Sequence, residues 1–183
     1  MKCQQTAISG LLLLTLDVYS DERGIFFEGY QGKRFEEMGI PPFVQDNFSI
    51  SKDGVIRALH YQVPPMAQGK LVQVLSGKVL DVAVDIRHGS PTFGKHVAVE
   101  LSAENHQQLW IPAGFAHGFA SLTEGTIFQY KCTGYYSAEH ERGIRYDDST
   151  LGIDWRVEKP ILNKRDLEHP LLSDIPKDFI FEG

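Results

Sequence analysis

Between residues 70 and 133 the chain consists of short segments in which apolar and polar positions alternate, separated by turn-forming residues. Alternation with a period of two is typical of β-strands that bury one face. The pattern predicts strands at residues 70–75, 78–86, 96–101, 108–111, 117–121 and 126–133. Because helical periodicity is scarce, we expect an all-β protein with a rolled antiparallel sheet.

The other predicted elements are short and peripheral. The apolar run 11–16 is predicted to be a buried strand, since a bilayer-spanning helix needs roughly 20 apolar residues and no basic n-region precedes the run. Short helices are expected at 32–38 and 163–168, and residues 174–183 are expected to form a tail or a strap. We expect one domain over residues 1–183, with no membrane partner.

Composition narrows the class of protein. A chain of 183 residues with 42% hydrophobic and 23% charged residues is typical of a globular protein with one sizeable core. The net charge of −6 gives no electrostatic reason to expect nucleic acid as a partner, so an anionic ligand would need local positive charge. Only Cys3 and Cys132 are present, which disfavours a disulfide framework and fits a reducing cytoplasm.

Two segments have the spacing of the metal-binding motifs of cupins. Residues 54–62 followed by Lys70 resemble the first motif, and residues 112–117 resemble the second. Where metal-binding cupins supply a second histidine and a glutamate, this sequence offers Gln62 and Lys70, and an ammonium group repels a divalent cation. The resemblance implies a cupin-like double-stranded β-helix, or jelly roll, that holds an organic anion and no metal cofactor.

Several ionisable residues are predicted to share this barrel. His60 alone is more simply explained as a core histidine. Arg57, Lys70 and His117 are predicted to lie in the same barrel, however, and a protein core rarely tolerates several ionisable side chains without a ligand or counterion. Lys70 could stabilise an oxyanion, and Tyr130 could act with His60 as an acid and base pair. Alternation places His60 with Gln62, Lys70 with Val72 and Val74, and Phe128 with Tyr130 and Cys132 on shared faces.

Other polar residues are candidates for ligand binding. Arg23 and Arg57 could clamp phosphate groups through paired hydrogen bonds, although an exposed salt bridge is the simpler explanation for Arg23. Glu28, Gln45 and Asn47 could bind a base or sugar, or could lie in a solvated loop. No glycine-rich fingerprint of a dinucleotide or phosphate loop is present.

Seven ordered blocks of sequence point to one family. The blocks are residues 21–28, 44–47, 57–62, 68–72, 111–119, 130–133 and 151–155. Through them the chain resembles the dTDP-4-dehydrorhamnose 3,5-epimerases over roughly residues 5–172. The resemblance implies a double epimerisation at C3 and C5 of a dTDP-linked 4-keto-6-deoxyhexose, without a cofactor. The implied product of dTDP-4-dehydro-6-deoxy-D-glucose is dTDP-4-dehydro-L-rhamnose.

The resemblance also implies roles for individual residues. His60 would abstract the protons, Lys70 would stabilise the enolate oxygen and Tyr130 would protonate the opposite face. The aspartate that pairs with the base corresponds to Asp166, although spacing alone does not select it over Asp81 or Asp85. The implied binding residues are Arg23, Glu28, Gln45 and Asn47 for the nucleotide, Arg57 for the diphosphate, and His117, Glu141 and Arg165 around the sugar and diphosphate.

The resemblance further implies a homodimer in which the N-terminal region of one subunit extends the sheet of the other and completes the nucleotide site.

Three alternative functions remain open from the sequence. A related enzyme could act at C3 or C5 alone, a cupin could bind sugar nucleotides without catalysis, and a metal-dependent dioxygenase is disfavoured by Gln62 and Lys70. Deuterium exchange from solvent at each carbon separates the first two from a 3,5-epimerase.

Overall fold

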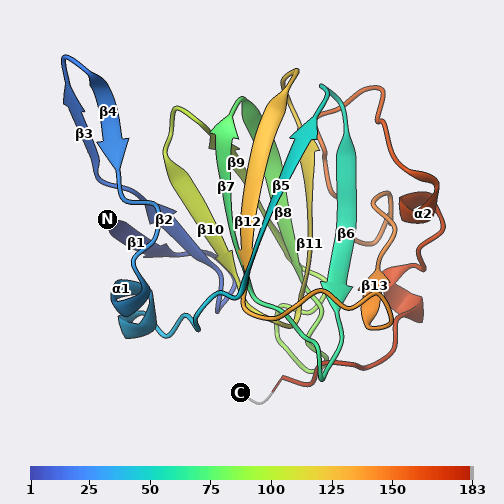
Figure 1. Cartoon of the computed structure of the whole chain (residues 1–183). Helices are drawn as coiled ribbons and strands as arrows, with labels where there is room; N and C mark the ends of the chain where they lie inside the picture. The colour runs from blue at the N-terminus through green and yellow to red at the C-terminus, as the bar shows by residue number, and fades with distance from the viewer. Residues whose placement is uncertain (182–183) are drawn as a thin grey trace.

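The computed structural model describes residues 1–181 and contains two antiparallel sheets that face each other (Figure 1). The six-stranded sheet has the order β1 (Lys2–Gln5), β2 (Leu12–Thr15), β10 (Gln107–Ile111), β7 (Lys70–Ser76), β12 (Thr126–Cys132) and β5 (Gln45–Ser51). The five-stranded sheet has the order β13 (Glu141–Gly143), β6 (Ile56–Gln62), β11 (Phe115–Ser121), β8 (Lys78–Asp85) and β9 (His96–Ser102). The expected all-β jelly roll is confirmed.

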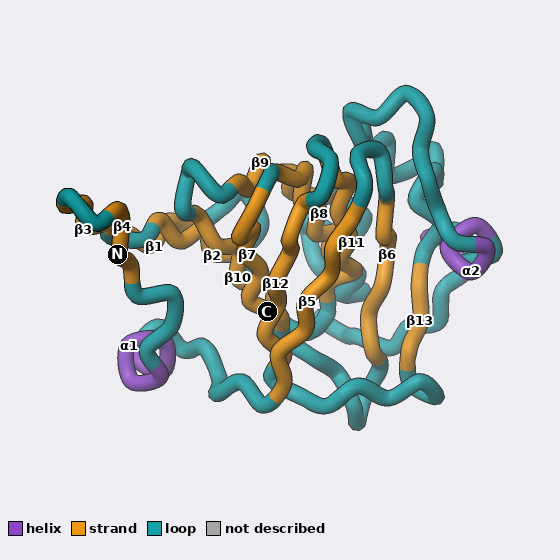
Figure 2. Tube along the Cα trace, turned by 45° about the horizontal axis from the view of Figure 1, so that its top comes forward, coloured by secondary structure: helices purple, strands orange, loops and turns teal. Residues whose placement is uncertain are grey.

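Small elements surround the sheets. A hairpin of β3 (Val18–Asp21) and β4 (Gly24–Phe27) projects from the N-terminal side, as Figures 1 and 2 show. Helix α1 (Gly32–Glu37), helix α2 (Lys164–Leu167) and a 3-10 turn at Leu172–Asp174 account for the helical residues that the structure describes. Neither α-helix is long and apolar enough to cross a membrane.

The space between the sheets holds one apolar cluster, which includes Val72 and Val74 of β7 and Phe128 of β12. A second cluster covers the outer face of the five-stranded sheet, where Trp155 and Leu172 of the C-terminal region pack on it. Because both of its faces are covered, β8 is buried at all but its first position. The C-terminal segment continues along the sheet, where the Phe181 backbone N–H donates to the His88 carbonyl at 2.9 Å. The segment expected to be a tail or a strap therefore contacts the sheet as far as residue 181, and residues 182–183 lie outside the described part.

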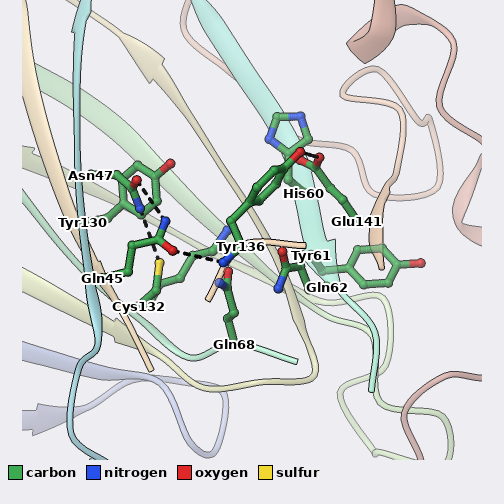
Figure 3. Close-up of a pocket in the computed structure, with 11 residues that line it drawn as sticks. Gln45, Asn47, His60, Tyr61, Gln62, Gln68, Tyr130, Cys132, Tyr136 and Glu141 are labelled. Atoms are coloured by element: carbon green, nitrogen blue, oxygen red, sulfur yellow. Dashed lines mark hydrogen bonds between the residues drawn. The ribbon is translucent and has the colours of Figure 1, made fainter. Parts of the chain in front are cut away.

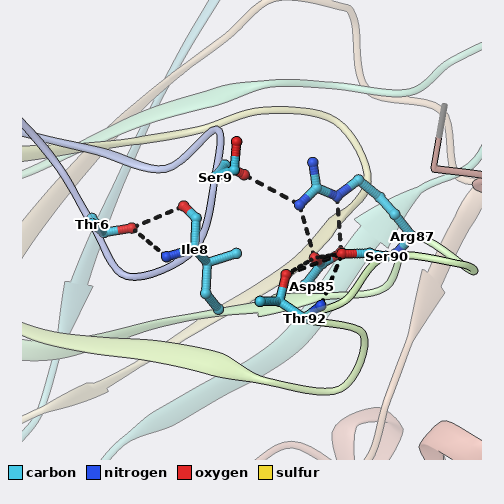
Figure 4. A network of polar contacts seen from close by, with 7 residues as sticks. All are labelled: Thr6, Ile8, Ser9, Asp85, Arg87, Ser90 and Thr92. Atoms are coloured by element: carbon cyan, nitrogen blue, oxygen red, sulfur yellow. Dashed lines mark hydrogen bonds and ion pairs between the residues drawn. The ribbon is translucent and has the colours of Figure 1, made fainter. Parts of the chain in front are cut away.

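The end of β8 is joined to the N-terminal segment by a polar network (Figure 4). Arg87 donates to both oxygens of Asp85, at 2.9 and 2.8 Å, and to the Ser9 carbonyl at 3.2 Å. Burial would raise the pKa of Asp85, but hydrogen bonds from Arg87, Thr92 and Ser90 outweigh it and lower the pKa to about 2. Asp85 is therefore engaged in a structural network at this end of the sheet.

Strand β6 carries a β-bulge that changes which side chains share a face. His60 pairs with His117 of β11, but Arg57 pairs with Phe119, so three steps along β6 match two along β11. An extra residue reverses the alternation on one side of the bulge. Arg57 and His60 consequently line the same hollow, although strict alternation from the sequence would place them on opposite faces.

Gly118 of β11 accommodates this bulge. A Cβ atom at Gly118 would lie 2.3 Å from the Ala58 Cβ and 2.8 Å from the Arg57 carbonyl oxygen. We expect Gly118→Ala to lower the free energy of unfolding by about 1–3 kcal/mol, because the backbone of β6 would have to move. Urea denaturation checks this, with Gly125→Ala as the control, since no atom lies within 4 Å of a Cβ there and only the positive φ of 67° opposes the change. Equal losses in the two variants would contradict the packing argument.

Candidate active site

Two adjoining hollows, of about 300 and 290 Å³, lie between the sheets and share His60, Lys70 and Tyr130 in their linings. Figure 3 shows residues that line the first of these hollows. Lys70 and Tyr130 come from the six-stranded sheet, whereas His60 comes from the five-stranded sheet. Gln45 and Asn47 line one hollow, and Arg57 and His117 line the other. The structure therefore gathers side chains from β5, β6, β7, β11 and β12 around one cavity.

Strand register explains how the six-stranded sheet supplies its part. Tyr130 of β12 pairs with Val72 on one side and with Asn47 on the other, while Cys132 pairs with Lys70 and Gln45. Paired residues in adjacent strands point to the same face. Asn47 and Tyr130 therefore flank each other, and Lys70, Gln45 and Cys132 form the next row toward the strand end.

His60 is paired with a buried carboxylate. Its Nε2 atom lies 2.7 Å from Oδ1 of Asp166, whose side chain is 1% exposed. Asp166 lies in α2, and its backbone N–H donates to the capping side chain of Asn163 at 2.7 Å. The chain thus holds the carboxylate in place through a helix cap, and the carboxylate in turn orients the imidazole.

The other two candidate carboxylates have different partners. Asp81 lies 2.9 Å from Nε2 of His117 and is fully buried, and Asp85 belongs to the Arg87 network. Of the three carboxylates that sequence spacing left open, Asp166 is the one that contacts His60.

Lys70 and Tyr130 lie close together, with the Lys70 Nζ atom 5.8 Å from the Tyr130 ring centroid. Burial lowers the pKa of Lys70, and burial raises the pKa of Tyr130. None of the ion pairs formed within residues 1–181 includes Lys70. The cavity therefore offers a buried lysine without a paired carboxylate beside a phenol whose raised pKa favours the protonated form.

A second group of polar residues lies at the rim. The Tyr136 hydroxyl donates to Oε2 of Glu141 at 2.7 Å, and Arg165 forms an ion pair with the same carboxylate. Burial would raise the pKa of Glu141, but hydrogen bonds from Arg165 and Tyr136 outweigh it and lower the pKa. The Tyr136 backbone N–H also donates to Gln45 at 3.0 Å, so this rim connects both sheets.

Arg23 and Glu28 are not brought to the cavity of the same chain. Arg23 is on the projecting hairpin, where it pairs with Asp21 at 2.6 Å, and Glu28 pairs with Arg34 at 2.9 Å. The hairpin also exposes Phe26, which is 70% accessible. Within one chain, Arg23 and Glu28 therefore lie apart from the ten other predicted catalytic and binding residues, which line the cavity or its rim.

Some lining residues lacked a role in the sequence interpretation. Gln62 and Gln68 line the cavity, and the backbone around residues 134–137 is held by their amides. Gln62 donates to the carbonyls of Met66 and Tyr135 and accepts from the Ser137 N–H. The Gln62 amide, at the position where metal-binding cupins have a histidine ligand, is therefore hydrogen-bonded to loop backbone. The cupin spacing indicated the position, but these partners depend on the folded loop.

Fold and cavity together define a cupin-like enzyme that works by acid–base chemistry. Its imidazole lies beside a buried carboxylate and shares the cavity with a lysine and a tyrosine. A family model described as dTDP-4-dehydrorhamnose 3,5-epimerase matches residues 5–174. The chain belongs to this family of isomerases, which confirms the resemblance.

Individual relatives agree with the family model. The chain is 52% identical over 169 residues to dTDP-4-dehydrorhamnose 3,5-epimerase of Shigella flexneri, covering 91% of this chain and 93% of the relative. The dTDP-6-deoxy-D-glucose-3,5-epimerase of Legionella pneumophila, solved with dTDP-4-keto-L-rhamnose, has a TM-score of 0.96 and 50% identity, covering 100% and 99% of the two chains. A 3'-monoepimerase of Streptomyces bikiniensis, solved with dTDP-quinovose, has a TM-score of 0.88 and 33% identity, covering 92% and 86%.

Proposed function

We propose that this chain converts dTDP-4-dehydro-6-deoxy-D-glucose to dTDP-4-dehydro-L-rhamnose by inverting C3 and C5. The observation that carries the proposal is the His60–Asp166 pair, which faces Lys70 and Tyr130 across one cavity. The ketone at C4 acidifies the hydrogens on both neighbouring carbons, so a single base beside the ring can act at each carbon in turn.

His60 is the proposed base. With Nε2–H donated to Asp166, the lone pair of Nδ1 remains free to accept a proton from carbon. The imidazolium that forms is stabilised by the buried carboxylate.

Lys70 and Tyr130 complete the proposed reaction. The Lys70 ammonium group stabilises the negative charge that develops on the C4 oxygen as the enolate forms. Tyr130 then donates its phenolic proton to the face of the carbon opposite His60, and this step inverts the configuration. The raised pKa of Tyr130 keeps the phenol protonated at neutral pH.

The remaining polar groups suit a nucleotide diphosphate. The chain has a net charge of −6, yet Arg57 and His117 line one hollow and Arg165 lies beside the other at the Glu141 rim. Guanidinium groups pair with phosphate oxygens through parallel hydrogen bonds. We therefore assign Arg57 to the diphosphate, and His117, Glu141 and Arg165 to the sugar and diphosphate.

A second copy of the chain would supply the missing nucleotide contacts. Arg23 and Glu28 lie away from the cavity of their own chain, and the hairpin that carries Arg23 exposes Phe26. We propose a homodimer in which the N-terminal region of one subunit joins the sheet of the other, so that Arg23 and Glu28 approach Gln45 and Asn47 of the neighbouring cavity. The open edge of β1 would be covered by such pairing.

We also propose one domain over residues 1–183 and a cytoplasmic location. The two sheets share a common core, which supports the first part. Cys3 and Cys132 are free thiols, which supports a reducing compartment.

The substrate assignment is tested by proton NMR of the purified chain with dTDP-4-dehydro-6-deoxy-D-glucose. The proposal predicts inversion at C3 and C5, seen in the ring coupling constants. Inversion at C3 alone would favour the monoepimerase alternative, to which the Streptomyces bikiniensis relative gives specific support. Binding without any conversion would favour a non-catalytic cupin.

Tyr130→Phe is expected to lower the rate of epimerisation about 100-fold or more while reducing C–H exchange much less. The reason is that His60 can still remove a proton and return one to the same face. Deuterium incorporation and product formation, followed together by NMR in D₂O, measure the two rates. Tyr146→Phe, outside the cavity, is the control; equal loss of both rates in Tyr130→Phe would contradict the assigned roles.

A further inference from the structure

A second histidine lies behind the His60–Asp166 pair. The Nε2 atom of His169 is 3.8 Å from Oδ1 of Asp166, and the rings of His169 and His60 meet edge to face with centroids 5.7 Å apart. One potential ligand atom from each of the three residues lies within 4.8 Å of the other two. Cupin spacing does not predict this cluster, because Asp166 and His169 lie outside both motifs.

The cluster contains polar atoms that lack partners. Oδ2 of Asp166 and Nε2 of His169 are buried without a hydrogen bond within residues 1–181, although the Asp166 side chain is only 1% exposed. Buried carboxylate and imidazole atoms without partners are costly, and such atoms often mark a site for an additional ligand.

The fold makes room for His169 by placing a glycine opposite His60. Gly143 of β13 pairs with His60, and a Cβ atom at Gly143 would lie 2.4 Å from Nε2 of His169. The His169 ring therefore occupies space that any larger residue at 143 would fill.

We propose that His60, Asp166 and His169 form an inhibitory site for a divalent transition-metal ion, with Zn²⁺ as the best match. Two imidazoles and one carboxylate are a common zinc donor set. Tetrahedral zinc, with ligand bonds of about 2.0 to 2.2 Å, separates its ligand atoms by about 3.4 Å. The separations of 2.7 Å for His60–Asp166 and 3.8 Å for His169–Asp166 lie on either side of that value.

Metal binding would stop catalysis through the tautomer of His60. An ion on Nε2 uses the lone pair of that nitrogen and leaves the single ring proton on Nδ1. Nδ1 would then be a donor and could no longer accept a proton from carbon. The ion would also take the Asp166 carboxylate, which otherwise stabilises the imidazolium.

This site differs from the metal site that the cupin spacing indicates. At the cupin positions Gln62 is committed to loop contacts and Lys70 would repel a cation, whereas His169 and Asp166 approach His60 from α2 and the segment that follows it. The inhibitory effect rests on the proposed role of His60, but metal binding itself requires no substrate.

The experiment uses the full chain, freed of metal by a chelator and titrated with Zn²⁺ by calorimetry and with Co²⁺ by visible absorption. We expect one ion per chain and a tetrahedral Co²⁺ spectrum. His169→Phe should weaken Zn²⁺ binding at least about tenfold, whereas His96→Phe, on β9 of the same sheet, should bind like the parent. Gly143→Ala, which displaces the His169 ring, should show the same loss as His169→Phe.

Activity is measured relative to the metal-free rate of each variant. Zn²⁺ should inhibit the parent reversibly, and His169→Phe should need at least about tenfold more Zn²⁺ for the same inhibition. Equal Zn²⁺ affinity in the parent, His169→Phe and Gly143→Ala would overturn the site. Stoichiometric binding that leaves the rate of an active parent unchanged would overturn its inhibitory role, and a parent without epimerase activity would instead contradict the proposed function while binding remained measurable.

Discussion

His60→Asn is expected to lower both C–H exchange and epimerisation by about 100- to 10,000-fold, the range typical of a positioned general base. Asparagine can still accept or donate a hydrogen bond near Asp166, but its amide is too weak a base to remove a proton from carbon. Because both reactions begin with the same abstraction, the two rates should fall together, in contrast to Tyr130→Phe. Deuterium exchange at C3 and C5, followed by NMR, measures the loss.

The matched control is His96→Asn, which makes the same change on another strand of the same sheet. It should keep activity within a fewfold of the parent. If His60→Asn still exchanged C3 or C5 hydrogen at close to the parent rate, another group would have to be the base, and the role of Asp166 would also be lost.

Lys70→Met is expected to lower kcat about 100- to 1,000-fold, which corresponds to a loss of roughly 3–4 kcal/mol of transition-state stabilisation. Methionine has a similar length but no charge to place beside the enolate oxygen. The affinity for dTDP should change much less, because the nucleotide contacts assigned above involve other residues. Steady-state kinetics and a dTDP binding titration measure the two effects.

The same variant should be at least as stable as the parent at pH 7. Burial lowers the pKa of Lys70, which means that folding disfavours its charged form. This penalty is fully present below the lowered pKa and is relieved as pH rises from that value toward 10.5, so replacing the lysine with an uncharged side chain removes the penalty. Lys78→Met is the control; a marked loss of stability in Lys70→Met alone would indicate a structural role instead.

Much of the fold was predictable because the central strands combine alternation with clear turns. The segment predicted at 126–133 is β12 (Thr126–Cys132), and the run 11–16 contains β2 (Leu12–Thr15). The hairpin β3–β4 and the edge strands β1, β5 and β13 were not predicted, since they lie at sheet edges or outside the two large sheets and bury no apolar face. Strands β5 and β13 form through pairing with segments that are distant in the sequence, and such pairing leaves no pattern in the local sequence.

The sequence indicated which types of residue form the site, but it indicated less well how these residues are arranged in space. His60, Lys70 and Tyr130 could be grouped because each lies on a strand with readable alternation. Arg57 joins them only through the bulge in β6, which adds a residue that alternation cannot reveal. Asp166 lies 106 positions from His60, and its choice over Asp81 depends on where α2 packs. His169 depends in addition on the space left by Gly143.

In the proposed reaction, His60 removes carbon-bound hydrogen on both sides of the ketone, and solvent-exchangeable groups return it. The direct measurement is the deuterium content at C3 and C5 of the product formed by the parent chain in D₂O, determined by NMR after one turnover. We expect deuterium at both carbons together with inversion at both. Inverted product that retains its original hydrogen at C3 and C5 would contradict it.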